Sequence, residues 1–95
     1  MNPPQEIPPE QSLIEYPCRF PIKVMGGNNP EFLAAMLSIA RAFEAEFDEQ
    51  MHVEQRPSKA GNYLGLTLSV HVVHREQLDE LYRTLTSHPL VKYVL

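Results

Sequence analysis

The chain of 95 residues contains one cysteine, Cys18, and no tryptophan. A single thiol cannot form an internal disulfide or the cysteine cluster of a structural zinc site, which favours a reducing compartment. No apolar run approaches the roughly 20 residues that cross a bilayer. The first residues, MNPPQEIPPEQS, also lack the basic and apolar regions of a secretory signal. We therefore expect a cytoplasmic protein without membrane association.

Neither sign of charge dominates the composition. Eight basic residues stand against twelve acidic ones, for a formal net charge of −4, so the chain as a whole does not attract nucleic acid. The length and the 43% hydrophobic fraction fit one soluble domain with a small core. Proline is concentrated near the start, where residues 1–12 are polar and contain two Pro-Pro pairs. Residues 1–15 are predicted to be a flexible arm, and residues 16–95 the folded domain.

Regular hydrophobic periodicity begins after Cys18. Alternation of apolar and polar side chains predicts strands, and apolar side chains at spacings of three and four predict helices. Asn29 and Pro30 are residues typical of a helix start. The pattern predicts six elements in the order β-α-β-β-α-β: residues 19–25, 30–46, 51–56, 63–72, 75–87 and 90–95.

This order predicts an α+β domain of the ferredoxin-like kind. Right-handed connections place both helices on one face of a four-stranded antiparallel sheet. Each predicted strand turns its apolar side chains toward the helices. The opposite face of the sheet is therefore expected to be open.

The alternation also predicts how the second and third strands pair. With Ala60-Gly61 at the hairpin tip, Glu54 lies opposite Thr67 and His52 lies opposite Ser69. His71 then lies diagonal to His52 on the open face. Two histidines without a further ligand of the right type make an incomplete metal site, so no metal is expected.

The stretch KVMGGNNPEF, residues 23–32, joins the first strand to the first helix. It matches neither the G-x-G-x-x-G fingerprint nor the P-loop pattern, so it does not predict a nucleotide-phosphate site. A structural turn and a small-metabolite site both remain as interpretations. The ligand-binding hypothesis names Lys23, Gly26, Gly27, Asn28 and Asn29.

The open face is predicted to be basic, although the chain is acidic overall. It carries Arg19, Lys23, Arg56 and Lys92, with Glu54 as its single acid. Only one aromatic side chain, Tyr63, is expected there, which does not favour RNA reading by base stacking. A polar face beside an uncovered edge strand favours pairing with another subunit or a protein partner. The interaction-surface hypothesis names Arg56, Ser58, Lys59, Asn62, Tyr63, His52 and His71.

Catalytic groups are not predicted. Cys18 has no base placed beside it, and the acids of both helices are expected on solvated faces rather than paired in a cleft. We therefore expect no catalytic residue, no cofactor and no enzymatic activity.

Three stretches carry a resemblance to a known family: YPCRFPIKVMG, NPEF, and RPSKAGNYLGLTLSVHVVHREQLDELYRTLTSHPLVKYVL. They resemble the YbeD-like bacterial family of unknown function over roughly residues 16–95. That family usually has a second serine at the position of Lys59. The resemblance implies a cytosolic ACT-like α/β sandwich, similar in fold to the regulatory domain of phosphoglycerate dehydrogenase and without established enzymatic activity.

ACT domains typically bind amino acids where the loop after the first strand meets a neighbouring subunit. The resemblance places that loop at residues 25–29. The ACT pattern usually has glycine just after the proline, whereas this chain has Glu31, whose charge would repel a ligand carboxylate.

The sequence thus predicts a non-enzymatic domain that binds a small ligand or acts in regulation, through self-association. The alternative is an interaction adaptor that docks a protein partner on the open sheet face. A nucleic acid partner is not favoured.

Overall fold

A computed structural model describes residues 15–95, which form four strands and three helices. The elements in chain order are β1 (Cys18–Gly27), α2 (Pro30–Phe43), α3 (Glu49–His52), β2 (Val53–Pro57), β3 (Tyr63–Val72), α4 (Arg75–Thr86) and β4 (Val91–Val94). The predicted arm, residues 1–15, lies outside the described residues except for Glu15. No helix of residues 15–95 is long and apolar enough to span a membrane.

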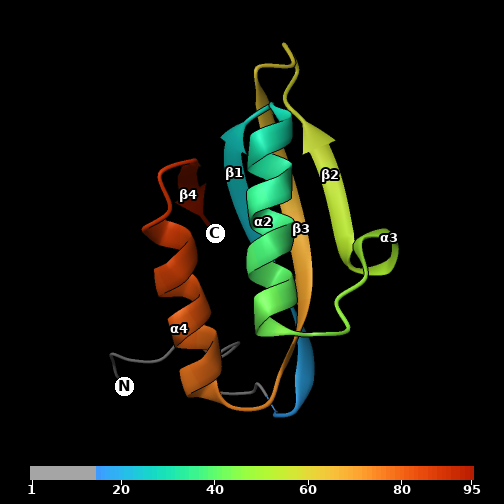
Figure 1. The fold of residues 1–95 in the computed structure, drawn as a ribbon, viewed down its shortest axis with the longest axis vertical. Helices are drawn as coiled ribbons and strands as arrows, with labels where there is room; N and C mark the ends of the chain where they lie inside the picture. The colour runs from blue at the N-terminus through green and yellow to red at the C-terminus, as the bar shows by residue number, and fades with distance from the viewer. Residues whose placement is uncertain (1–14) are drawn as a thin grey trace, which may run out of the picture.

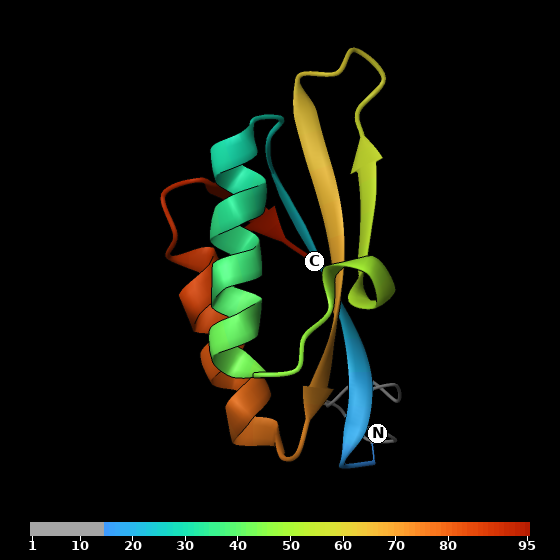
Figure 2. The ribbon, with the colours of Figure 1, turned by 45° about the vertical axis from the view of Figure 1, so that its right-hand side comes forward.

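The four strands form one antiparallel sheet in the order β2-β3-β1-β4. Helices α2 and α4 lie on the same face of this sheet (Figures 1 and 2). No helix or strand of the described chain covers the other face. The predicted α+β, ferredoxin-like and ACT-like arrangement is therefore confirmed, with α3 as a short helix that the pattern did not predict.

The core lies between the sheet and its two helices. Even-numbered side chains of β1 and β3 point toward the helices, as the alternation predicted. They are buried along all of β3 and from Ile22 onward in β1, whereas Cys18 and Phe20 are half-buried. Burial of a large apolar side chain contributes roughly 1.5–3 kcal/mol, so this layer is the main source of stability. The fully or almost fully buried side chains include Ile22, Val24, Phe32, Met36, Leu66, Leu68, Val70, Val72 and Leu85.

Helix α2 begins where the capping pattern predicts. The Asn29 side chain accepts a hydrogen bond from the Phe32 backbone N–H at 2.8 Å, and Pro30 occupies the first turn. The Phe32 ring packs directly over Gly26. A Cβ atom on Gly26 would lie 2.4 Å from the ring, so only glycine fits there.

Helix α2 ends at Phe43, whereas the sequence predicted it to continue to residue 46. The backbone of Glu44 is extended, and its N–H caps the helix by donating to the Ala40 carbonyl at 2.8 Å. Phe47 is buried and reaches the core from the loop that follows α2.

The predicted register of β2 and β3 is confirmed, since Val53 lies opposite Leu68 and Glu54 opposite Thr67. The predicted start of β2 is wrong. Met51 and His52 belong to α3, so His52 does not lie opposite Ser69, and Met51 is 75% exposed. Asp48 caps α3 by accepting a hydrogen bond from the Gln50 N–H at 2.9 Å.

Candidate functional site

The open face of the sheet holds two rows of side chains that run across the strands. The first row pairs Arg56 with Gly65, Gly65 with Met25, and Met25 with Tyr93. The second row contains Glu54, Thr67 and Lys23, and it ends at Leu95, whose N–H donates to the Lys23 carbonyl at 2.7 Å.

A groove of about 290 Å³ lies over these two rows. We call it the cross-strand groove; its lining side chains include Lys23, Met25, Glu54, Arg56, Ser58, Thr67, Tyr93 and Leu95. Its volume is at the lower end of the range for small-molecule sites, and it combines apolar surface with a few polar groups, as such sites do.

Gly65 forms the floor of the groove. It lies in the centre of β3 between Arg56 and Met25, and its missing side chain leaves the hollow. A Cβ atom there would lie 3.4 Å from the Arg56 carbonyl oxygen and 3.5 Å from the Met25 methyl group. These are ordinary contact distances, so the backbone does not require glycine at this position.

The aromatic content of the open face exceeds the prediction. Tyr93 pairs with Met25, lines the groove and is 51% exposed, so Tyr63 is not the only aromatic ring on this face. A shift of register between Met25 and Gly26 places Lys92 in a bulge of β4. The Lys92 ammonium lies 5.6 Å from the centre of the Tyr63 ring, within cation–π range.

The corner at residues 26–29 makes hydrogen bonds to the hairpin tip and to α2. Asn28 donates from its backbone to the Asn62 carbonyl at 3.0 Å and from its side chain to the Gly61 carbonyl at 2.9 Å. Asn29 caps α2. The corner of the ligand-binding hypothesis therefore contacts the hairpin of the interaction-surface hypothesis. Lys23 lies apart from the corner, in the groove.

Ser58, Lys59, Asn62 and Tyr63 belong to the hairpin between β2 and β3. Ser58 donates its N–H to the Tyr63 carbonyl at 2.8 Å, and its hydroxyl accepts from the Tyr63 N–H at 3.1 Å. Lys59 and Asn62 are exposed at the tip, and Ser58 also lines the groove.

The two histidines predicted to be diagonal neighbours are not a pair on the open face. His52 belongs to α3, where its Nδ1 accepts from the Asp48 N–H at 3.0 Å and its ring lies 5.4 Å from that of Phe47. His71 stays in β3 opposite Arg19. Within residues 15–95, no three His, Cys, Asp or Glu side chains cluster in a way that could hold a metal ion.

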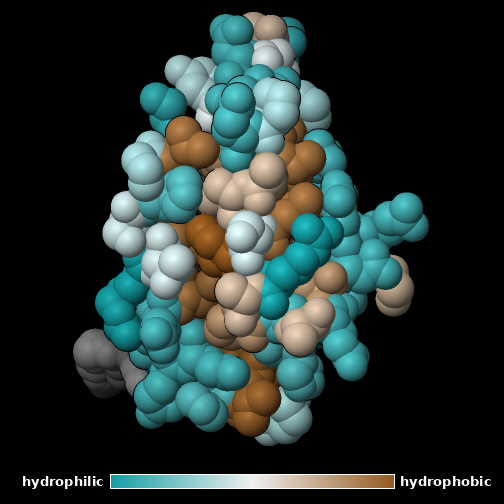
Figure 3. Space-filling model, in the orientation of Figure 1, coloured by the Kyte–Doolittle hydropathy of each residue, from teal (hydrophilic) through white to brown (hydrophobic). Residues whose placement is uncertain are grey.

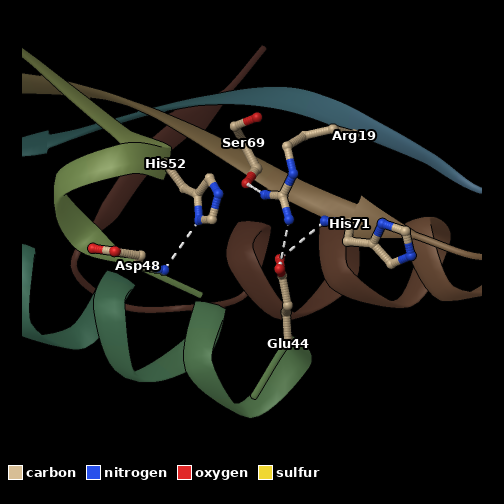
Figure 4. A network of polar contacts seen from close by, with 6 residues as sticks. All are labelled: Arg19, Glu44, Asp48, His52, Ser69 and His71. Carbon is tan, nitrogen blue, oxygen red and sulfur yellow. Dashed lines mark hydrogen bonds and ion pairs between the residues drawn. The ribbon is translucent and has the colours of Figure 1, made fainter. Parts of the chain in front are cut away.

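Hydrogen bonds join Arg19, Glu44, Ser69 and His71 in the place predicted for the first residues of β2 (Figure 4), and we call this group the polar clasp. The Arg19 guanidinium donates to the Ser69 carbonyl and to Glu44, at 2.6 Å from the carboxylate oxygen. The other Glu44 oxygen accepts from the His71 N–H at 3.0 Å. Arg19 and Glu44 thus provide hydrogen-bond partners for backbone groups of β3 beyond the end of β2.

The carboxyl group of Glu44 responds to this environment. Burial by itself would raise its pKa, but the hydrogen bonds from Arg19 and from the His71 N–H, with the positive charge of Arg19, lower the pKa below its ordinary value of 4.5. The clasp is therefore strongest when Glu44 is ionised.

Two further hollows lie on the helical side. One, between α2 and α4, is lined by Ile39, Phe43 and Leu81, and apolar side chains are visible between the helices in Figure 3. The other is lined by Tyr16, Phe20 and residues of α4 that include Tyr82, whose pKa is raised by burial. The second hollow is also lined by two exposed cations, Arg75 and Arg83, but Arg75 lies 3.8 Å from the carboxylate of Asp79 and forms an ion pair with it.

The chain matches a family described as a protein of unknown function, DUF493, over residues 11–95. It is 62% identical over 91 residues to a UPF0250 protein of Leptothrix cholodnii, which covers 96% of this chain and 99% of the relative. A UPF0250 protein of Bordetella pertussis is 57% identical over 89 residues, covering 94% and 97% of the two chains. Another, from a Janthinobacterium species, is 54% identical over 90 residues, with coverage of 95% and 98%.

Proposed function

This chain belongs to the DUF493 family of proteins of unknown function, as its resemblance to the YbeD-like family predicted, and we propose that it acts by binding rather than by catalysis. The proposal is a small regulatory domain that receives a small anionic ligand in the cross-strand groove and works in a self-associated form. The observation that carries it is a hollow of about 290 Å³ flanked by Lys23 and Arg56 on an otherwise acidic chain.

Lys23 and Arg56 outnumber Glu54, the acidic side chain of the groove, and therefore support an anionic ligand. Neither Lys23 nor Arg56 forms an ion pair with a carboxylate of residues 15–95. Their charges can therefore be used by a bound anion without first breaking an internal contact. Met25, Tyr93 and Leu95 supply apolar surface for the rest of the ligand.

The proposal uses residues from both surfaces that the sequence predicted. Lys23 comes from the corner, and Arg56 and Ser58 come from the interaction surface. In this proposal Gly26, Gly27, Asn28 and Asn29 shape the neighbouring turn.

Thermal-shift screening with amino acids, inorganic phosphate and small carboxylates tests this proposal. A ligand should raise the melting temperature of the wild type, and Gly65→Ala should reduce the effect because the added methyl group fills the groove floor. Ser69→Ala, on the same strand but outside the groove, is the matched control and should respond like the wild type. If no compound at millimolar concentration shifts the melting temperature, the small-ligand proposal is wrong.

A protein partner on the same face is the second candidate. It is favoured by Tyr63, which lies outside the groove and is exposed, as are Tyr93 and Leu95 of the groove lining. A Lys23→Glu/Arg56→Glu variant should lose such a partner in an affinity pull-down. Equal recovery of the same proteins by the wild type and by this variant would count against the adaptor.

A further inference from the structure

The outer edge of β2 has a defined set of backbone groups. The Ser58 N–H donates to the Tyr63 carbonyl, so the backbone N–H and C=O groups of even-numbered residues in β2 point toward β3. Those of Gln55 point away from the sheet, toward its open edge. The outward N–H of Val53 is already used by the Glu49 carbonyl, and Pro57 has no N–H. Gln55 is therefore the central residue of this edge that presents both a donor and an acceptor.

The sequence of this edge, Val53-Glu54-Gln55-Arg56-Pro57, is complementary to itself. We propose that two copies of the chain pair their β2 strands antiparallel about a two-fold axis at Gln55. The two Gln55 residues then exchange both backbone hydrogen bonds. Glu54 faces the partner's Arg56 in the adjacent position, where side chains of an antiparallel pair approach most closely.

Both faces of the joined sheet support this register. On the open face, the symmetry places two Glu54–Arg56 ion pairs across the junction. On the helical face, the Gln55 side chains meet each other, and Val53, which is half-buried, meets the partner's Pro57. A shift of the register by two residues would place Glu54 opposite Glu54 or Arg56 opposite Arg56, and like charges in these positions destabilise pairing. The charge pattern therefore selects one alignment.

The charges disfavour the other obvious self-contact, which stacks two open faces. Lys23, Arg56 and Lys92 would meet the same three cations of the partner, with only Glu54 on each side to compensate. The edge contact has no such conflict. It is limited to five residues, because α3 precedes β2 and the hairpin follows it (Figure 1). An interface this short predicts a weak dimer that forms at high concentration.

This inference rests on the self-association part of the proposed function, and the dimer can be tested without a ligand. It also links self-association to ligand binding, since Arg56 lines the groove. An anion in the groove and Glu54 of the partner compete for the same guanidinium group, which would couple ligand and assembly.

Sedimentation of the full chain at concentrations up to about 1 mM tests the interface, because that range detects weak association. The wild type should approach twice its 10.9 kDa mass. Glu54→Arg and Arg56→Glu should each sediment as monomers, because each places like charges across the junction. The Glu54→Arg/Arg56→Glu double variant should recover the dimer, and an equimolar mixture of the two single variants should form the mixed dimer.

Arg83→Glu, an exposed charge reversal on α4, is the control and should sediment like the wild type. Circular dichroism should show the same fold for all variants, since Glu54 and Arg56 are exposed. Single variants that dimerise like the wild type would overturn this interface and leave self-association intact. A monomeric wild type at about 1 mM would overturn both, whereas the groove stands or falls on its own ligand screen.

Discussion

Removing Glu44 should destabilise the fold, because this carboxylate accepts a hydrogen bond from the His71 N–H of β3, at a position that β2 does not reach. Its side chain is only 14% exposed and accepts from both Arg19 and the His71 N–H. Hydrogen bonds to charged groups contribute roughly 1.5–3 kcal/mol each when buried, whereas exposed ion pairs contribute roughly 0–1 kcal/mol. Arg19 is partly exposed, so we expect Glu44→Ala to cost about 2 kcal/mol, with the larger share from the His71 N–H.

Urea unfolding at pH 7 measures this cost directly, and thermal unfolding should show a drop on the order of 10 °C for a domain of this size. Glu44→Gln should cost less, roughly 1 kcal/mol, because the amide oxygen can still accept from the His71 N–H. A double-mutant cycle with Arg19→Met should show that the two side chains are coupled.

The dependence on pH follows from the lowered pKa of Glu44. A carboxyl group with a folded-state pKa below its unfolded-state value stabilises the fold above the unfolded value. That contribution is lost as pH falls below about 4.5 through the folded-state value. The gap in unfolding free energy between the wild type and Glu44→Gln should therefore shrink with falling pH. A gap that does not change with pH, or a cost of Glu44→Ala below about 0.5 kcal/mol, would refute this account of the clasp.

Four other substitutions test the fold around the site. Gly26→Ala should destabilise by about 1–3 kcal/mol in urea unfolding, because its Cβ would lie 2.4 Å from the Phe32 ring. Gly65→Ala should stay within about 1 kcal/mol of the wild type. Equal costs for the two substitutions would contradict the geometry. Asn29→Ala should lose about 1 kcal/mol with the helix cap, and an unchanged midpoint would remove its capping role. Met51→Lys should change stability by less than about 0.5 kcal/mol, because Met51 is 75% exposed; a loss typical of a core position would place residue 51 in the strand instead.

Local alternation was enough to predict most of this fold. The apolar residues of β1, β3 and α2 recur with the period of a strand or a helix because one side of each element is buried. This period can be read from a single sequence. The start of β2 was mispredicted because Met51 and Val53 fit the same alternation. The decisive contact, Arg19 and Glu44 on the edge of β3, joins residues 25 positions apart in the chain. Asp48, followed by Glu49, was a capping signal that could have predicted α3.

The groove was predictable only in part. The basic character of the open face followed from the alternation, which placed Lys23 and Arg56 there. Tyr93 was missed because the bulge at Lys92 shifts the register of β4, and a bulge leaves no clear mark in four residues. Gly65 is a signal in the sequence, since glycine inside a strand often marks close approach of another group.

Amide NMR of the labelled protein, titrated with inorganic phosphate and separately with benzoate, tests most directly whether the open face is a binding site. The account predicts chemical-shift changes concentrated at Gly65, Leu66 and Thr67, and their loss in Lys23→Gln. Changes confined to α2 and α4, or no saturable change with either anion up to solubility, would contradict it.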